Sequence, residues 1–332
     1  MGIIGAFLAF WHSHIFVTLP TPTKQFTGQT IIVTGSNTGL GLEAARQLVQ
    51  LDAAKVILAV RSLDRGNAAK SSIEASTGRQ GVVEVWELDL SRYDSVKTFG
   101  ERINSTLERL DVVVENAGVL TQKWAMAEDN EITITINVVS TFLLALLVLP
   151  KLRETSTKFA KDVVLTFTGS FVHWITLFPE RKADRIFEET ARKEKARLWD
   201  RYNVSKLMEL LVFRQLSDKL SASPKPGRII TSILNPGVVE TDLNREVQLG
   251  ILGIPRRIFM RIVGRRPVEG SRTLVHAAEG APETHGQYLD DCRIGKVSTF
   301  VTSQDGIETQ KRLWEELIEN LESIQPGISQ NI

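Results

Sequence analysis

The sequence contains little cysteine and almost no excess charge. Cys292 is the single cysteine among 332 residues, so the chain can form no internal disulfide and no cysteine-rich metal site. Its 40 basic side chains are balanced by 39 acidic ones, which argues against a nucleic-acid-binding protein, because such proteins usually carry a basic excess. With 23 glycines and 11 prolines, the chain is neither collagen-like nor disordered. We expect a cytoplasmic globular protein that binds neither nucleic acid nor a metal.

Charge is also missing from the start of the chain. No Asp, Glu, Lys or Arg precedes Lys24, and residues 2–11 are all apolar or glycine. The segment lacks the basic region and cleavage site of a secretory signal. His12-Ser13-His14 interrupts it before the roughly 20 apolar residues that a membrane span needs. Two interpretations of residues 1–27 stay open: an arm that packs onto the body of the protein, or a segment that associates weakly with a membrane.

Short β-branched runs alternate with helix-forming segments along the middle of the chain, a pattern that predicts βαβ units on a parallel sheet. The expected strands cover residues 30–34, 55–60, 112–114 and 163–169. Residues 142–149 are apolar nearly all round and are expected to form a buried helix. Residues 307–324 carry apolar side chains at helical spacing among charges, which predicts an amphipathic helix that closes the fold.

A glycine-rich turn joins the first expected strand to the helical sequence of residues 42–49. Glycine has no Cβ, so it allows a tight turn and a close approach of the backbone to a pyrophosphate. The helix that follows offers free N–H groups to the phosphates. This unit predicts an α/β fold of the Rossmann type, a doubly wound parallel sheet in a single domain over residues 28–332. The expected cofactor contacts here are Gly35, Ser36, Asn37, Gly39, Leu40 and Gly41.

The end of the second strand indicates which dinucleotide is bound. NAD sites usually have an acidic residue there to hold the ribose 2′-hydroxyl, whereas a nearby arginine accommodates the 2′-phosphate of NADP. Here Val60 stands at the acidic position and Arg61 follows it. The sequence therefore predicts NADP(H), with Arg61 at its 2′-phosphate.

Further polar motifs follow in a fixed order. Asp89 lies near the end of the third strand region, Asn116 begins Asn-Ala-Gly after residues 112–114, and Ser170 ends the run 163–169. Asn137 lies in the helical region between the last two. After them, Tyr202 and Lys206 form a Tyr-x-x-x-Lys pair, and residues 235–241 read Asn-Pro-Gly-Val-Val-Glu-Thr.

Jointly, over about residues 28–245, these motifs resemble the short-chain dehydrogenase/reductase family. Within it, the chain looks most like the retinol-dehydrogenase-like subgroup, particularly its fungal members. One departure is Glu115, which stands where the family has the first Asn of Asn-Asn-Ala-Gly. The resemblance implies that the catalytic residues are Ser170, Tyr202, Lys206 and Asn137. It also implies that further cofactor contacts are Asp89, Asn116, Tyr202, Lys206, Val239 and Thr241.

The chemistry of these residues fits those roles. Tyr202 and Lys206 are four apart and share one helix face. A phenol with an ordinary pKa near 10 becomes more acidic beside an ammonium. Tyr202 would exchange a proton with the substrate oxygen, Ser170 would stabilise the charge developing on that oxygen, and Lys206 would hold the nicotinamide ribose. Asn137 would hold a water that links Lys206 to solvent.

Two segments depart from the family pattern. Residues 171–201 form a long insertion between Ser170 and Tyr202, with an apolar start that is expected to line the substrate pocket and a charged helical part, residues 188–195, that is expected to lie over it. His173 within it is either a structural histidine or a substrate contact. Residues 243–267 are basic and amphipathic, and the resemblance implies that they form a substrate lid, which could also contact an anionic membrane surface.

The leading hypothesis is an NADP(H)-dependent oxidoreductase that interconverts a ketone or aldehyde and an alcohol on a fairly large apolar small-molecule substrate. The resemblance to fungal members implies a secondary-metabolite pathway, and family members often pair through the helices of residues 142–149 and of Tyr202, which implies a homo-oligomer. Two alternatives remain: an isomerase or dehydratase with a retained cofactor, and a non-catalytic cofactor-binding scaffold.

Overall fold

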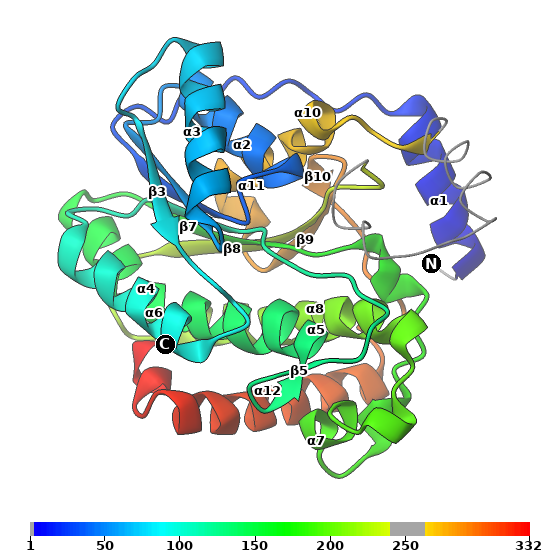
Figure 1. Cartoon of the computed structure of the whole chain (residues 1–332). Helices are drawn as coiled ribbons and strands as arrows, with labels where there is room; N and C mark the ends of the chain where they lie inside the picture. The colour runs from blue at the N-terminus through cyan, green and yellow to red at the C-terminus, as the bar shows by residue number, and fades with distance from the viewer. Residues whose placement is uncertain (1–2, 240–262) are drawn as a thin grey trace.

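The computed structural model describes residues 3–239 and 263–332, in which eight strands form one sheet in the order β10-β9-β8-β7-β4-β1-β2-β3 (Figure 1). Neighbouring strands are parallel except for β10, which runs antiparallel to β9. The strands are β1 (Thr30–Thr34), β2 (Lys55–Val60), β3 (Val83–Glu87), β4 (Val112–Glu115), β7 (Val163–Thr168), β8 (Ile229–Asn235), β9 (Gln287–Asp290) and β10 (Arg293–Ile294). A separate two-stranded hairpin pairs β5 (Met126–Ala127) with β6 (Asn130–Glu131).

Helices cover both faces of the sheet, as Figure 1 shows. One face packs against α2 (Gly39–Gln50), α3 (Leu63–Thr77) and α11 (Arg272–Ala278), and α10 (Pro267–Gly270) packs on α2 and α11. The other packs against α4 (Tyr93–Thr106), α6 (Thr141–Lys158) and α8 (Leu198–Ala222), with α12 (Gln304–Ile324) outside them. The doubly wound α/β prediction is confirmed, as are the four expected strands and the closing amphipathic helix.

Shorter helical elements connect these layers. They are α5 (Ile132–Ile134), η1 (Thr135–Ser140), η2 (Phe171–Trp174), η3 (Pro179–Lys182), α7 (Ile186–Thr190), η4 (Lys193–Lys195), η7 (Pro282–Thr284) and η8 (Ile328–Asn331). Of these, η1 is a π-helix and the other η elements are 3₁₀ turns.

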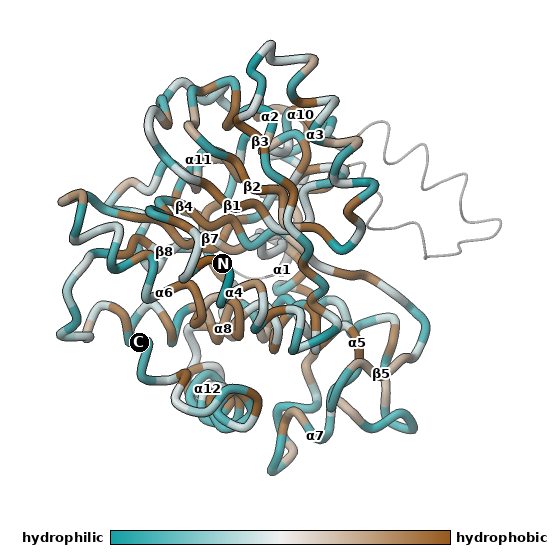
Figure 2. Tube along the Cα trace, turned by 60° about the vertical axis from the view of Figure 1, so that its left-hand side comes forward, coloured by the Kyte–Doolittle hydropathy of each residue, from teal (hydrophilic) through white to brown (hydrophobic). Residues whose placement is uncertain are grey.

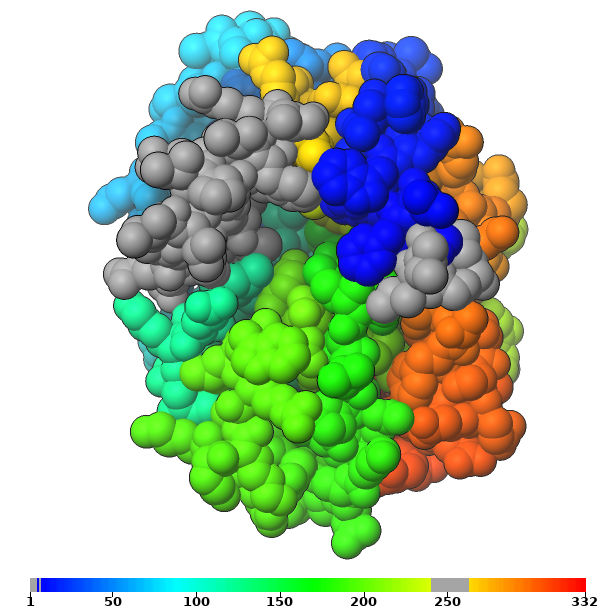
Figure 3. Space-filling model, turned by 90° about the vertical axis from the view of Figure 1, so that its right-hand side faces the viewer, coloured from blue at the N-terminus to red at the C-terminus, as the bar shows by residue number. Residues whose placement is uncertain are grey.

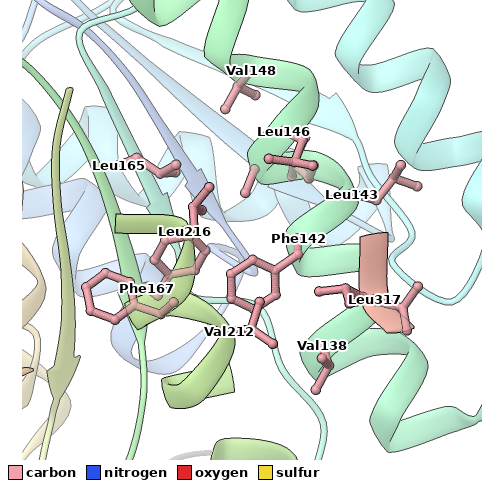
Figure 4. Packing of buried hydrophobic residues seen from close by; sticks show 14 of the residues in the cluster. Val138, Phe142, Leu143, Leu146, Val148, Leu165, Phe167, Val212, Leu216 and Leu317 are labelled. Atoms are coloured by element: carbon pink, nitrogen blue, oxygen red, sulfur yellow. The ribbon is translucent and has the colours of Figure 1, made fainter. Parts of the chain in front are cut away.

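The larger core cluster lies between the sheet and the α6/α8 layer. Phe142 of α6 stacks on Phe167 of β7 with ring centroids 5.1 Å apart, and Phe167 meets Phe213 of α8 edge-on. Figure 4 shows Val212, Leu216 and Leu317 closing around these rings, and Figure 2 shows the apolar residues following the strands and inner helices. Residues 132–158 are apolar and long enough to span a membrane, yet 89% of their most apolar window is buried in the protein. This burial confirms the core helix expected at residues 142–149.

The C-terminal helix covers the surface of that layer. Leu313, Leu317 and Leu321 of α12 are fully buried, and α12 packs along α8, while η8 packs on α6. The outer faces of α6 and α8, through which the family resemblance implies pairing, are therefore in contact with the chain's own C-terminal segment.

The uncharged N-terminal segment forms α1 (Ile3–Phe16). One side of α1 packs on the body: Phe10 contacts Phe171 with ring centroids 5.1 Å apart, and His14 Nε2 accepts a hydrogen bond from Val238 N at 2.8 Å. The opposite side exposes apolar residues, with Leu8 67% and Phe16 74% exposed. Figure 3 shows α1 directly beside the segment that follows Ser170.

The insertion of residues 171–201 differs in part from its prediction. The expected charged helix of residues 188–195 is wrong, because α7 ends at Thr190 and only a 3₁₀ turn follows. α7 packs against α12, and the expected position of residues 188–195 over the substrate pocket stays a prediction. Glu316 of α12 accepts hydrogen bonds from Ile186 N and Phe187 N, and Arg185 pairs with Glu319 at 2.7 Å. These contacts draw the segment toward the acidic side chains of α12.

Candidate active site

The glycine turn has no room for larger side chains. Gly35 has a positive φ of 64°. A Cβ placed on Gly41 would lie 2.6 Å from the Gly35 carbonyl oxygen and equally close to Asn116 Nδ2. Ser36 Oγ donates a hydrogen bond to Val33 O, and Asn116 Nδ2 donates one to Thr34 O at 2.8 Å. Ser36 and Asn116 therefore shape this turn from within.

A cavity of about 380 Å³ opens at the carboxyl ends of β1, β2 and β4. Four of the predicted cofactor contacts line it: Gly35, Asn37, Arg61 and Asp89. The other predicted contacts among the described residues do not line it; they are Ser36, Gly39, Leu40, Gly41, Asn116, Tyr202, Lys206 and Val239. Gly39 begins α2, so the N–H groups of its first turn lack intrahelical partners. Thr241 and residues 243–262 of the expected lid lie outside the described residues.

The cavity also contains residues that the sequence motifs did not indicate. Ser62 accepts a hydrogen bond from Arg65 N and so begins α3, and this turn places exposed Arg65 beside Arg61 at the cavity wall. The Ser-x-x-Arg spacing after a strand end was the available signal. Two exposed guanidinium groups at one end make this cavity suitable for an anion.

The expected catalytic side chains come together at the ends of β7 and α8. Ser170 follows β7 and caps η2, where its Oγ accepts a hydrogen bond from Val172 N. Tyr202 and Lys206 lie on the second and third turns of α8, and the Ser170 side chain is within hydrogen-bonding reach of the Tyr202 hydroxyl. A Cβ on Gly118 would lie 3.3 Å from Asn137 Oδ1 and 3.8 Å from Lys206 Nζ. All four predicted catalytic residues are therefore neighbours.

Asn137 occupies an irregular turn of helix. It lies in the π-helix η1, an element often found at functional sites. Its Oδ1 accepts a hydrogen bond from Val119 N, and its Nδ2 donates to Val119 O and Ser205 Oγ. Both amide hydrogens are thus in use, and the side chain is held beside Lys206 with one acceptor position left.

Lys206 is held by two protein acceptors. Its Nζ donates to Thr168 O and to Glu209 Oε2, each at 2.7 Å. Both side chains of the ion pair are buried, at 6% and 2% exposure. Burial alone would lower the pKa of Lys206, but the Glu209 carboxylate, together with Tyr202, raises it above its ordinary value. Lys206 is therefore an ammonium at neutral pH.

The acidity of Tyr202 differs from the sequence expectation. Loss of solvent around the half-buried phenol raises its pKa, and Glu209 raises it further, whereas Lys206 and a hydrogen bond with Ser170 lower it. The net direction is upward. The expectation omitted the loss of solvent around the phenol, which is the largest cause of the shift, and the Glu209 carboxylate that offsets the Lys206 ammonium.

A second buried carboxyl group lies close by. Glu115, the departure from the family's Asn, ends β4 and accepts a hydrogen bond from Thr34 Oγ1 at 3.3 Å, while its Oε1 is buried without a partner. Burial raises the pKa of Glu115 to about 8, with a further contribution from Glu209. Glu115 is therefore mostly protonated at neutral pH.

The start of α8 is held by a buried ion cluster. Arg201, 1% exposed and adjacent to Tyr202, contacts Glu180 at 3.3 Å and Glu131 at 3.7 Å. Glu180 belongs to the insertion and Glu131 to the β5–β6 hairpin. The cluster links both segments to the tyrosine helix, a connection that spacing along the chain does not reveal.

His173 is a structural residue. It is 2% exposed, its Nδ1 lies 2.7 Å from Ser170 O, and its Nε2 accepts a hydrogen bond from Ser298 N. Burial lowers the pKa of His173 to about 4. The neutral imidazole therefore fixes the backbone of Ser170 against the loop before α12, and of the two interpretations of His173 the structural one is confirmed.

Comparisons with known proteins agree with this geometry. The short chain dehydrogenase family matches residues 29–161. The chain is 44% identical over 98% of its length to the whole of short chain dehydrogenase/reductase dmxR8 of Cryptosporiopsis sp.. It is 46% identical to short chain dehydrogenase atnD of Emericella nidulans, over 86% of this chain and 91% of that one. Short-chain dehydrogenase anuD of Penicillium roqueforti is 40% identical, over 97% and 84%.

Solved structures have the same fold. A short chain dehydrogenase of Shigella flexneri, crystallised with NADP, superposes with a TM-score of 0.57 at 23% identity, over 81% of this chain and 99% of that one. Pseudomonas aeruginosa RhlG, in a complex with NADP, gives a TM-score of 0.60 at 20% identity, over 82% and 97%. From the fungal relatives and the matching family, the chain belongs to the short-chain dehydrogenase/reductase family of oxidoreductases.

Proposed function

We propose that the protein is an NADP(H)-dependent oxidoreductase that interconverts a ketone or aldehyde and an alcohol on a bulky, mainly apolar substrate. The observation that carries the proposal is the grouping of Ser170, Tyr202, Lys206 and Asn137 beside the arginine-lined cavity. A scaffold that only bound the cofactor would not need a half-buried phenol next to a buried ammonium, and the grouping therefore favours catalysis over that alternative.

The residues present fit a dinucleotide phosphate. The Gly35–Gly41 turn has no space for a Cβ at Gly41, as expected where backbone must approach a pyrophosphate. Arg61 and Arg65 at the cavity wall would hold the 2′-phosphate, and Asp89 would lie near the adenine. The solved neighbours crystallised with NADP support the same assignment. When bound, NADPH supplies the hydride of the reaction.

The chain's own residues supply and control the proton. Tyr202 would donate its phenolic proton to the substrate oxygen in reduction and accept it in oxidation. Ser170 would donate a hydrogen bond to that oxygen and stabilise its developing charge. Lys206 would hold the nicotinamide ribose through the donor left free by Thr168 and Glu209, and Asn137 would hold a water at its remaining acceptor position.

The substrate side is lined by aromatic residues. A hollow of about 260 Å³ lies between α1 and η2 and is lined by Phe10, His14, Phe171, Trp174 and neighbouring polar groups. We assign residues 1–27 as an arm that contributes to this wall, residues 28–332 as the catalytic domain and residues 243–267 as its lid. The exposed apolar side of α1 also suits weak contact with a membrane, which we include in the proposal. The fungal relatives support a place in secondary metabolism.

The test is steady-state oxidation of NADPH with a panel of cyclic, aromatic and aliphatic ketones and aldehydes. We expect turnover with bulky apolar carbonyls and a loss of roughly 10²- to 10⁴-fold in Tyr202→Phe, the range that general acid catalysis contributes. NADPH affinity, measured by cofactor fluorescence, should stay within about threefold in the variant, because other residues bind the phosphates. Full activity in Tyr202→Phe, or product formation from an alcohol without net change in NADP(H), would contradict the proposal and favour the isomerase or dehydratase alternative.

A further inference from the structure

The lysine of the Tyr-x-x-x-Lys pair has a carboxylate partner that no motif includes. Glu209 lies three residues after Lys206 on α8, and the two side chains form an ion pair of 2.7 Å. Both residues are buried. A buried carboxylate is costly unless it is paired, so an acidic residue at this place requires an explanation.

Counting hydrogen-bond donors shows how firmly Lys206 is held. A lysine ammonium has three N–H donors and no acceptor. One donates to Thr168 O at the end of β7, and a second donates to Glu209 Oε2. A single donor is left for the cofactor ribose or a water. Glu209 therefore fixes both the position of Nζ and the direction of its remaining N–H.

Glu209 also changes the charge that Tyr202 meets. The titratable groups that act on this part of α8 are Tyr202 and Lys206 on the same helix and Glu115 from β4. Because the pKa of Glu115 is about 8, that carboxyl group is mostly neutral at pH 7. Burial raises the pKa of Glu209 as well, whereas the ammonium of Lys206 lowers it. The 2.7 Å contact makes Glu209 the anion that balances Lys206, so Tyr202 lies beside a neutral pair and not beside an isolated cation.

We propose that Glu209 is a positioning residue that neutralises and orients Lys206 and thereby offsets the effect of the Lys206 ammonium on the Tyr202 hydroxyl. The proposal rests on the proton-donor function of Tyr202 proposed above and deepens it. A protonated phenol is the form required to reduce a carbonyl group, so the buried acid extends the pH range of that form to more basic pH.

Glu209→Gln removes the negative charge and keeps the size of the side chain. The unbalanced ammonium should then stabilise the phenolate and lower the pKa of Tyr202 by about one unit, at the low end of the effect of a nearby charge. The chain has only three tyrosines. Burial raises the pKa of Tyr93 to about 12 and that of Tyr288 well above its ordinary value. Ultraviolet titration of phenolate, with Tyr202→Phe as the blank in each background, therefore isolates Tyr202.

A matched control pair exists in α6. Lys151 and Glu154 have the same three-residue spacing and a distance of 2.6 Å, but Glu154 is half exposed and is not among the groups that shift the pKa of Tyr202. Glu154→Gln should leave the Tyr202 titration unchanged, and Glu209→Asp, which keeps the charge, should produce less than half the shift of Glu209→Gln. Equal shifts in Glu209→Gln and Glu154→Gln, or no shift in either, would overturn the proposal.

The titration needs neither substrate nor cofactor, so its outcome is separate from that of the proposed function. If Glu209→Gln does not fold, the same titration of the parent protein still tests the proposal. A pKa of Tyr202 below the ordinary value near 10 would contradict it. With an active carbonyl substrate, the basic limb of the reduction pH profile should move to lower pH by the same amount in Glu209→Gln. Loss of activity without that movement would indicate a merely structural role and overturn the proposal.

Discussion

The two sides of the active site are built in different ways. On the cofactor side, the glycine turn and the arginine pair come from one stretch of chain, from β1 to the start of α3, and these arginines are exposed. On the substrate side, residues more than 100 positions apart come together: Phe10 with Phe171 in the wall, and His173 with Ser298 behind Ser170. The first side is specified by local sequence and the second by tertiary packing.

The two sides also differ in the exposure of their charged side chains. Arg61 and Arg65 are solvated, as suits groups that meet a phosphate. Around Tyr202, by contrast, the charged groups Lys206, Glu209 and Arg201 are all buried, where electrostatic interactions are strong and an unpaired charge is costly. Substitutions on the cofactor side should therefore change binding alone, whereas those around Ser170 and Tyr202 should also change stability and its pH dependence.

The largest effect is expected in acid, from His173. Its pKa falls from 6.5 to about 4 on folding, so the unfolded chain binds more protons between these values and stability rises with pH there. His173 makes its full contribution to the free energy of unfolding above pH 6.5. This contribution decreases toward pH 4 by up to about 3 kcal/mol, at 1.36 kcal/mol per pKa unit. Urea unfolding of the parent protein at pH 7, 6, 5 and 4 measures it.

His173→Gln cannot titrate, so its stability should fall less steeply than that of the parent protein between pH 6.5 and 4. His12→Gln, at an exposed position of α1, should keep the parent's slope. Parallel curves for the parent and His173→Gln would show that the imidazole is not held neutral, and the contrast with the cofactor side would lose its main support.

A smaller and more selective effect is expected from Arg61→Ala. Hydrogen bonds to charged groups contribute about 1.5–3 kcal/mol, so NADPH affinity should fall roughly 10- to 100-fold, while NADH affinity and the unfolding midpoint stay unchanged. Fluorescence titration with both cofactors measures this preference. Arg293→Ala, at an exposed arginine on the opposite edge strand β10, is the matched control. An equal loss for NADPH and NADH would place Arg61 away from the 2′-phosphate.

The sequence predicts the cofactor side well because its rules are local. The strand Thr30–Thr34, the turn through Gly41 and the start of α2 follow each other directly, and each has a recognisable preference of its own. The family motifs also name Ser170, Tyr202, Lys206 and Asn137 as the candidate catalytic residues, and the fold brings the four together. The neighbours of Tyr202 were not identified, because Glu209 and Arg201 read as ordinary surface charges of a helix until the fold buries them.

The insertion of residues 171–201 shows most clearly what the local sequence does not predict. Residues 188–195 have a helix-forming composition, yet α7 ends at Thr190. Glu316 and Glu319, more than 120 residues later, set the direction of the chain at α7. Glu316 accepts a hydrogen bond from Ile186 N, and Glu319 accepts one from Arg185. Such contacts override local propensity, and no spacing within the insertion predicts them.

The smallest effect is expected from Phe10→Ala, which tests whether α1 belongs to the substrate side. Phe10 and Phe171 form a ring pair in the wall of the 260 Å³ hollow, and such pairs contribute about 0.5–1.5 kcal/mol. We expect KM for a bulky carbonyl substrate to rise roughly two- to tenfold, with NADPH affinity unchanged. Phe16→Ala, on the same helix but 74% exposed, should change neither. If Phe10→Ala weakened NADPH binding as much as substrate binding, the contact of His14 with Val238 N would transmit the change to the cofactor, and the two sides would form one coupled unit.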